Sequence, residues 1–181
     1  MNIFLPSEIN TENLILRPLQ VEDAPSLFAL DSDNRVMQYL GNQVLTDIAQ
    51  VYQYLENIIL QYEENGIGRW TVIENKSGKL IGWSGIKLIR EETNGHEDFY
   101  DLGYRLRPQF WGLGYATESA KAWTKIADET LNIEFLYATA HVENQGSQRV
   151  LKKSGFEITS SYDFILSGVP IPCVWMERKR K

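Results

Sequence analysis

The fold is decided by residues 109–116, which read Gln109-Phe110-Trp111-Gly112-Leu113-Gly114-Tyr115-Ala116. The residues before this stretch, 101–106, alternate with the period of a half-buried strand. After it, alanine and tryptophan side chains recur at helical spacing, at positions 116, 120, 123 and 127. The two glycines therefore lie in a turn that joins a strand to the N-terminus of a helix.

A turn of this kind is suited to bind phosphate. The first N–H groups of a helix have no partner within the helix, and the helix dipole places roughly half a positive charge there. Glycine lets the backbone adopt a positive φ and approach a ligand closely. These properties predict an anion site at Gly112 to Gly114, although an ordinary strand-to-helix turn would carry the same glycines.

Two other phosphate-binding loops fit the stretch less well. A Walker loop needs Gly-Lys followed by Ser or Thr, whereas Gly114 is followed by Tyr115 and Ala116. A dinucleotide fingerprint needs Gly or Ala three residues after Gly114, where the sequence has Thr117. No parallel βαβ unit with a ribose-binding acid is evident either, so both alternatives are disfavoured.

The patterns along the rest of the chain predict an α/β sheet with helices on its faces. The polar segments 34–46 and 90–100 are expected to be loops. A helix is expected to begin at an N-cap on Thr46 and to end at Asn65-Gly66, and another to run from Asn144 to Lys153 with Gly155 as its left-handed C′ residue. Further helices are expected at 22–30 and after Gly114, and strands at 14–18, 70–74, 79–89, 101–106, 133–140, 156–160 and 174–178.

Length and composition predict one domain that spans residues 1–181, and they exclude several functions. The net charge of −6 disfavours nucleic-acid binding, which depends on basic patches. No apolar run approaches the ~20 residues of a membrane span, and the N-terminus lacks the features of a signal peptide. Cys173 stands alone in an apolar run and is expected to be a buried structural thiol. With two distant histidines it makes no metal site, and a cytoplasmic location is predicted.

Residues 102–118 resemble the acetyl-CoA motif of the GNAT acetyltransferases, Q/R-x-x-G-x-G/A. The flanking Leu-Gly-Tyr, Trp-Gly and Tyr-Ala-Thr-Glu are similar to the branch that contains the ribosomal-protein N-terminal (Rim-type) acetyltransferases. A second block, 140–156, resembles that branch's N-x-x-S followed by a helix that ends in Gly-Phe. Since 14–30 also resembles the branch's first strand and helix, the resemblance covers nearly the whole chain.

The resemblance implies a GNAT fold, in which a mixed, mostly antiparallel sheet is splayed at its centre and carries helices on both faces. It implies acetyl-CoA as cosubstrate, no metal, and transfer of acetyl to a primary amine by direct attack. The acceptor implied by the branch is a protein N-terminal α-amine. A small-molecule amine is the alternative, and a non-catalytic acyl-CoA-binding module is a rival from another class. The expected state is a monomer or homodimer.

The resemblance also implies the residues that bind acetyl-CoA. The pantetheine arm would pair with free backbone groups of Leu106 and Arg107, and an N–H group near Tyr104 to Leu106 would hold the thioester oxygen. Basic side chains at 121, 125, 149, 152 and 153 are candidates for the 3′-phosphate. The diphosphate would lie on the backbone N–H groups of Trp111, Gly112, Leu113, Gly114, Tyr115, Ala116 and Thr117.

For catalysis, the resemblance implies that Asn144 contacts the pantetheine arm or the acceptor. Ser147 would lie near the sulfur and protonate the leaving thiolate. Both residues are also ordinary at the start of a helix, where Asn is a good N-cap. Asp101 is the favoured general base. The other candidates are Glu118, Glu143 and His141, while Trp70, Trp83, Tyr104 and Trp175 either line an acceptor groove or belong to the core.

Overall fold

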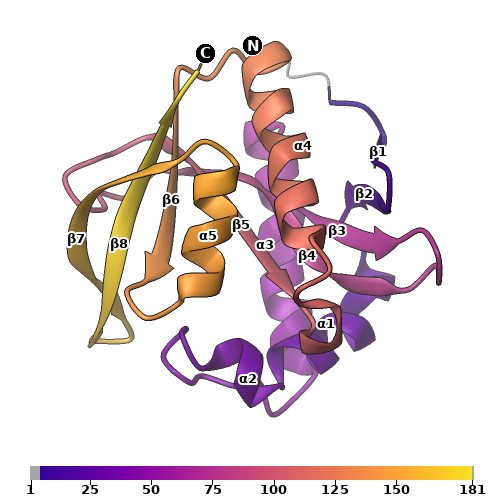
Figure 1. The fold of residues 1–181 in the computed structure, drawn as a ribbon. Helices are drawn as coiled ribbons and strands as arrows, with labels where there is room; N and C mark the ends of the chain where they lie inside the picture. Colours follow the sequence, from indigo (N-terminus) through magenta and orange to yellow (C-terminus); the bar gives the residue numbers. More distant parts are fainter. Residues whose placement is uncertain (1–4, 181) are drawn as a thin grey trace.

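We describe the protein from a computed structural model, which describes residues 5–180. The strands form one sheet in the order β1-β2-β3-β4-β5-β6-β8-β7, and every neighbouring pair is antiparallel except β5 and β6 (Figure 1). This confirms the predicted mixed, mostly antiparallel sheet. The strands are β1 (Ile9–Asn10), β2 (Leu14–Pro18), β3 (Arg69–Glu74), β4 (Leu80–Ile89), β5 (Phe99–Leu106), β6 (Phe135–His141), β7 (Glu157–Leu166) and β8 (Val169–Lys179).

Helices cover both faces of the sheet, as predicted. In Figure 1, α4 (Tyr115–Glu129) and α5 (Gln145–Lys153) lie in front of the sheet, and α1 (Ala24–Asp31) and α3 (Ala49–Asn65) lie behind it. The short helix α2 (Asn34–Met37) lies at the lower edge, within a segment whose sequence predicts a loop. Two 3₁₀ turns, Val21–Asp23 and Pro108–Phe110, precede α1 and α4.

Each face has its own hydrophobic core. The α4 face buries one stripe of that helix, Ala120, Trp123 and Ala127, against β2 to β6. Trp123 is fully buried, and its indole N–H donates to the Ser84 hydroxyl at 3.1 Å. On the opposite face, α1 and α3 pack together in a smaller core, and Trp83 of β4 packs against its edge.

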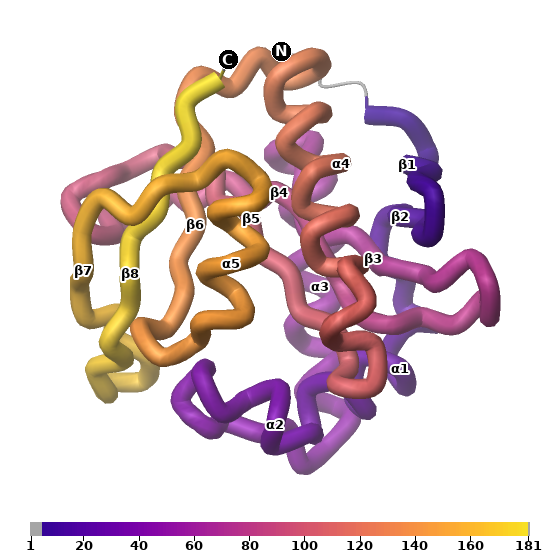
Figure 2. The backbone as a smooth tube through the Cα atoms, in the orientation of Figure 1, coloured from indigo at the N-terminus to yellow at the C-terminus, as the bar shows by residue number. Residues whose placement is uncertain are grey.

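The sheet is splayed between β5 and β6. The two strands pair only at Tyr100 with Leu136 and at Asp101 with Tyr137, and beyond Asp101 they run apart (Figure 2). Along β5, backbone groups alternate between the two neighbouring strands. Because the N–H of Arg107 bonds to Ile81 at the start of β4, the even-numbered residues of β5 direct their N–H and C=O groups towards β6, and those beyond the last pair therefore face the gap.

The start of α3 differs from the prediction. Its N-cap is Ile48, whereas Thr46 lies outside the helix and takes part only through its backbone N–H. The N–H of the first helical residue, Ala49, donates instead to the Asp47 carboxylate at 2.9 Å. The N–H groups of Thr46 and Asp47, just before the helix, donate to the Gln50 amide oxygen. The Asp47 carboxylate therefore binds a free N–H at the start of α3, the role that the sequence predicts for the Thr46 hydroxyl.

The C-terminal hairpin of β7 and β8 is much longer than the predicted strands. Almost every residue of β7 is exposed, so the strand lacks the alternation that marks a half-buried one. Pro170 and Pro172 interrupt the pattern of β8, yet both lie before Cys173, where its pairing with β6 begins. Proline is tolerated there because no neighbouring strand needs its missing N–H on that side.

Asp23 fixes the corner between β2 and α1. Its carboxylate accepts from both terminal nitrogens of Arg17, at 2.7 and 2.8 Å, from the Gln20 N–H at 2.9 Å and from the Thr71 hydroxyl at 2.8 Å. The residue is buried. Burial alone would raise the pKa of this carboxyl, but the hydrogen bonds from Arg17, Gln20 and Thr71 lower it below its usual value.

Candidate active site

The turn before α4 leaves a run of backbone donors free. The first hydrogen bond of the helix joins the Glu118 N–H to the Gly114 C=O at 3.0 Å, and the N-cap, Gly114, makes no side-chain cap. Within residues 5–180, no oxygen accepts from the N–H groups of residues 112–117. Most helices cap these donors with a Ser, Thr, Asp or Asn side chain. An uncapped, exposed N-terminus of this kind can bind a diphosphate.

Glycine is required twice in this turn. Gly112 and Gly114 have φ angles of +78° and +88°, in the left-handed region that other residues rarely adopt. A Cβ on either glycine would meet no atom within 4 Å, so the space beside both is open. Backbone conformation, rather than crowding in the protein, therefore explains the two glycines, and the open space suits a ligand that approaches the main chain.

Two details of the predicted acetyl-CoA contacts are corrected. Trp111 is not part of the free run, because its N–H donates to the Pro108 C=O at 3.1 Å. The backbone groups of Arg107 are not free either, since its N–H bonds to Ile81 at 2.8 Å and its C=O accepts from Phe110 at 3.0 Å. The N–H of Arg107 bonds to β4 because backbone groups alternate along the strand, and its C=O accepts a hydrogen bond within the 3₁₀ turn at 108–110.

Leu106 is the residue at the mouth of the gap. By the alternation of β5, its N–H group faces the opening towards β6, as predicted for a partner of the pantetheine arm. Its C=O accepts from the indole Nε1 of Trp111 at 2.7 Å. The indole thus lies across the entrance to the gap, whereas the sequence predicts only a backbone role for Trp111.

Asn144 and Ser147 lie together in the first turn of α5. The Asn144 Oδ1 accepts from the Ser147 N–H at 3.0 Å, so Asn144 is the N-cap of the helix. The Ser147 hydroxyl lies 3.0 Å from the hydroxyl of Tyr104, which reaches across from β5. The helix ends as predicted, with Gly155 at φ +92° and its N–H bonded to Lys152.

Asp101 is held by an arginine that sequence reasoning missed. Arg69 of β3 forms an ion pair with the Asp101 Oδ2, donates to the Asp101 C=O at 2.8 Å and also donates to the Gly85 C=O. Gly103 makes room for this guanidinium, because a Cβ there would lie 2.7 Å from an Arg69 nitrogen. The Oδ1 of Asp101 has no hydrogen-bond partner in the described part of the chain.

Asp101 and Ser147 approach the gap from opposite sides of the sheet. Successive side chains of a strand point to opposite faces, so Asp101 and Tyr104 diverge. Tyr104 packs with the α4 core and reaches Ser147, whereas the partner of Asp101, Arg69, lies 5.4 Å from the Trp83 ring on the α1–α3 face. A carboxylate and a hydroxyl thus flank the point where β5 and β6 separate.

The comparison with known proteins identifies the family. Residues 13–157 match the sequence profile of the acetyltransferase (GNAT) domain, which is most of the chain. The protein is a GNAT acetyltransferase. Among its relatives, the uncharacterized N-acetyltransferase YoaA of Bacillus subtilis is 27% identical over 149 residues, which cover 82% of both chains.

Solved structures share the fold of this acetyltransferase at low sequence identity. RimL, a ribosomal L7/L12 α-N-protein acetyltransferase in complex with coenzyme A, aligns with a TM-score of 0.79 and 19% identity, over 96% of this chain and 98% of that chain. A spermidine N-acetyltransferase from Vibrio cholerae, in complex with CoA and spermine, aligns with a TM-score of 0.75 and 19% identity, over 94% and 97% of the two chains. The predicted GNAT fold is therefore confirmed.

Three of the five basic candidates for the 3′-phosphate of CoA come together in this acetyltransferase. Lys121, Lys152 and Lys153 line a pocket of about 350 Å³ between α4 and the end of α5. In the described part of the chain, no carboxylate lies within 4.0 Å of these amines. Lys125 instead lies 3.9 Å from Glu129, and Arg149 does not line the pocket.

Two of the other three candidate bases of this acetyltransferase have structural partners, and the third, Glu143, is exposed. Both oxygens of Glu118 are bonded, to the Thr11 hydroxyl at 2.6 Å and to Asn13 at 2.7 and 3.0 Å, so Glu118 anchors the turn between β1 and β2. His141 accepts from the Glu143 N–H at 3.1 Å and packs against Tyr39. Glu143 is exposed in the turn before α5.

The aromatic candidates divide between the core under α4 and the α1–α3 face of the sheet. Trp70 packs edge-on against Trp123 and is buried under α4. Trp83 lies on the opposite face between Arg69 and Arg105, whose guanidinium carbons lie 5.4 and 5.1 Å from the ring. Trp175 is also buried, and His96 stacks on it at 5.0 Å, although the sequence predicts an exposed loop around this histidine.

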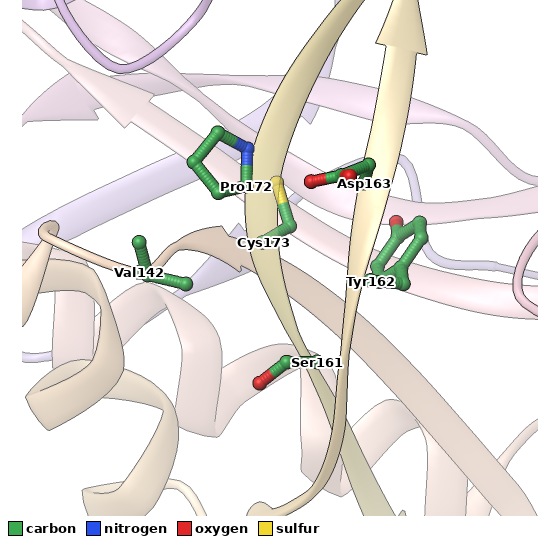
Figure 3. Close-up of a pocket in the computed structure, with 6 residues that line it drawn as sticks. All are labelled: Val142, Ser161, Tyr162, Asp163, Pro172 and Cys173. Carbon is green, nitrogen blue, oxygen red and sulfur yellow. The ribbon is translucent and has the colours of Figure 1, made fainter.

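Cys173 faces a separate hollow beside the middle of the β7–β8 hairpin, where it pairs with Tyr162 (Figure 3). Tyr162, Asp163 and Pro172 line this space of about 240 Å³ with it. The thiol is buried, and burial raises its pKa to about 11. A thiol with so high a pKa is a poor nucleophile at neutral pH, which agrees with its predicted structural role.

The described residues lack two further kinds of feature. Within residues 5–180, no helix is long and apolar enough to cross a membrane. The same residues contain no group of three His, Cys, Asp or Glu side chains placed to share a metal ion.

Proposed function

We propose that this GNAT acetyltransferase transfers acetyl from acetyl-CoA to the N-terminal α-amine of a protein in the cytoplasm, as a monomer or homodimer. The observation that carries the proposal is the splayed sheet, with free N–H donors before α4 at one end of the gap and Ser147 and Asp101 on its two sides. Acetyl-CoA supplies an acetyl group that is already activated as a thioester, so no covalent enzyme intermediate is needed.

The residues present fit acetyl-CoA. The six N–H groups of residues 112–117 offer main-chain donors to the diphosphate, as in other helix-terminal phosphate sites. The backbone of Tyr104 and Leu106 faces the gap, where an amide-bearing arm can pair as an added strand. A donor of this set is also placed to bind an oxygen as negative charge develops on it.

Ser147 and Asp101 divide the proton transfers. Acetyl transfer to an amine forms a C–N bond and breaks a C–S bond, so nitrogen loses one proton and sulfur gains one. Asp101, with its free Oδ1 on the α1–α3 face, accepts the proton from nitrogen, directly or through a water molecule. Ser147 gives its proton to the leaving sulfur from the α5 side and regains one from solvent water, and Asn144 holds Ser147 through the helix cap.

The charge of the acceptor face supports an α-amine over a polyamine. Arg69, Arg105 and Lys87 lie on this face of the sheet, against Asp101 and Asp31. Burial, followed by repulsion from Arg69, lowers the pKa of Lys87. A polycation would meet these positive groups, whereas a peptide N-terminus brings one amine and carbonyl groups that accept hydrogen bonds. The name of RimL, as an α-N-protein acetyltransferase, agrees with this choice.

A spermidine-type acceptor is the second candidate, because a spermidine N-acetyltransferase shares the fold. A panel of acceptors separates the two. We expect thiol release from acetyl-CoA with peptides that have a free N-terminus, and none with the same peptides blocked at the N-terminus but carrying lysine. Activity on spermidine alone would overturn the α-amine proposal. Tight acetyl-CoA binding without turnover on any amine would overturn acetyl transfer itself.

Asp101→Asn is expected to lower kcat/KM about 10- to 100-fold at pH 7, because the variant cannot take up the proton. The pKa of an α-amine is near 8, so the deficit should shrink towards pH 9, where most of the acceptor is already neutral. The measurement is the pH profile of thiol release with a peptide acceptor. Glu143→Gln, which removes an exposed carboxylate in the turn before α5, is the control and should keep the wild-type profile. A deficit that is constant with pH would contradict the base role.

Lys152→Ala is expected to raise KM for acetyl-CoA about 5- to 10-fold, because a charge-assisted bond to the 3′-phosphate is lost. Lys121 lies seven residues, or roughly 10 Å along α4, from Gly114, so the pocket is near the diphosphate cradle. The variant should bind acetyl-dephospho-CoA, which lacks this phosphate, as well as the wild type does. Lys125→Ala, on the same helix outside the pocket, is the control. An equal loss with both cosubstrates would refute the assignment.

A further inference from the structure

Tyr104 and Ser147 form a contact that spans the splay. Tyr104 belongs to β5 beyond the last pair with β6, and Ser147 belongs to α5, which follows β6 in the chain. The Tyr104 hydroxyl lies 2.9 Å from the Ser147 C=O and 3.0 Å from the Ser147 Oγ. This one hydroxyl therefore connects the two sides of the gap at the height of the proposed proton donor.

Only one arrangement of the two hydroxyl protons makes both contacts hydrogen bonds. A carbonyl oxygen can only accept, so the one proton of the Tyr104 hydroxyl is donated to the Ser147 C=O. The contact between the two hydroxyls must then be a bond that Ser147 donates to Tyr104. Without substrate, the Ser147 hydroxyl proton is directed at the Tyr104 oxygen. The same Tyr104 hydroxyl bonds to the Ser147 C=O, so the Ser147 Oγ is held in one position.

We propose that Tyr104 is a positioning residue, which acts through Ser147 by fixing the Ser147 hydroxyl at the edge of the gap. The inference rests on the proposed function, because it assumes that Ser147 assists the leaving sulfur. Rotation about the Cβ–Oγ bond redirects the Ser147 proton to the sulfur, while the bond from Tyr104 to the carbonyl stays intact. The Tyr104 hydroxyl gives up no proton, and the Tyr104 side chain touches neither substrate.

The surroundings of Tyr104 agree with a role in which the phenol stays protonated. Burial raises the pKa of Tyr104 well above its usual range, and the hydrogen bond with Ser147 offsets this only in part. The side chain packs against the core under α4 and α5, which restricts its movement. Its hydroxyl therefore serves as a fixed donor to the Ser147 backbone at any pH at which the protein works.

A double-mutant cycle tests the proposal. Tyr104→Phe should lower kcat about tenfold and change KM for acetyl-CoA less than twofold, because the binding groups are untouched. Ser147→Ala should lower kcat about 100-fold. In the Ser147→Ala background, Tyr104→Phe should change kcat less than twofold, since the residue through which it acts is already gone. The alkaline limb of the pH profile should be the same in wild type and Tyr104→Phe.

Tyr62→Phe is the matched control. Like the Tyr104 hydroxyl, its hydroxyl donates to a backbone carbonyl, that of Arg69, but its other partner is the Leu19 N–H rather than a side chain, and it belongs to α3 on the other face. It should lower the melting temperature as Tyr104→Phe does and leave kcat unchanged. A kcat of Tyr104→Phe equal to that of wild type, or a tenfold effect that persists with Ser147→Ala, would overturn the inference alone. A wild-type protein that acetylates no amine would overturn the proposed function, and this inference with it.

Discussion

Gly114→Val is expected to weaken acetyl-CoA binding at least about 100-fold, or about 2.7 kcal/mol. The φ of Gly114 is +88°, which a β-branched residue adopts only with strain, so the turn must rearrange and its N–H groups lose their common direction. The side chain would also project into the open space beside the turn. Isothermal titration calorimetry with acetyl-CoA measures the effect.

Gly168→Val is the matched control for this loss. Gly168 has a φ of +80°, and a Cβ there would likewise meet no atom within 4 Å, but it lies between β7 and β8, away from the cradle. Both variants should unfold at lower temperature by similar amounts, and only Gly114→Val should lose affinity. Equal affinities of the two variants for acetyl-CoA would exclude the turn as the diphosphate site.

Asp23→Asn is expected to lower the free energy of unfolding by about 3 kcal/mol, because Arg17 would lose the partner of its charge in a largely buried site. For a chain of this size, that loss corresponds to a midpoint roughly 6–12 °C lower. The pKa of Asp23 is lower in the folded protein than in the unfolded chain. Its contribution is therefore complete above the unfolded pKa of about 4 and is lost as the pH falls through the folded pKa.

Denaturant unfolding at several pH values tests this expectation. The difference between wild type and Asp23→Asn should be constant from pH 6 to pH 8 and should shrink below about pH 4. Asp33→Asn is the control, because Asp33 pairs with Arg35 at 2.6 Å on the surface, where ion pairs contribute little. A difference between wild type and Asp23→Asn that grows with acidity would show that the sign of the pKa shift is wrong.

The architecture around the turn at Gly112 and Gly114 could be predicted because local signals there agree. The strand alternation of β5, the two glycines and the helical spacing of Ala120, Trp123 and Ala127 all indicate one strand-turn-helix unit. Glycine at positive φ and an uncapped helix start are properties of a few adjacent residues, so they can be read locally. The diphosphate proposed to bind the N–H groups of residues 112–117 is inferred from the same short segment.

Contacts between distant segments could not be predicted in this way. Nothing near Asp101 in the sequence indicates Arg69, which reaches it only because β3, β4 and β5 are neighbours and Gly103 leaves space. The hydrogen bond from Tyr104 to Ser147 depends on the position of α5 relative to β5, which is fixed by tertiary packing. The sequence predicts too short a strand for β7 because its exposed residues, which cover no core, carry no hydrophobic pattern.

The most direct test of the central claim is an NMR titration of the backbone amides with acetyl-CoA. The claim is that the N–H groups of residues 112–117, left without partners in the described part of the chain, bind the diphosphate. The largest shifts are expected at Gly112 to Thr117, followed by Leu106, because these donors acquire an acceptor on binding. Saturable binding that leaves the amides of 112–117 unshifted and moves another surface instead would contradict the account.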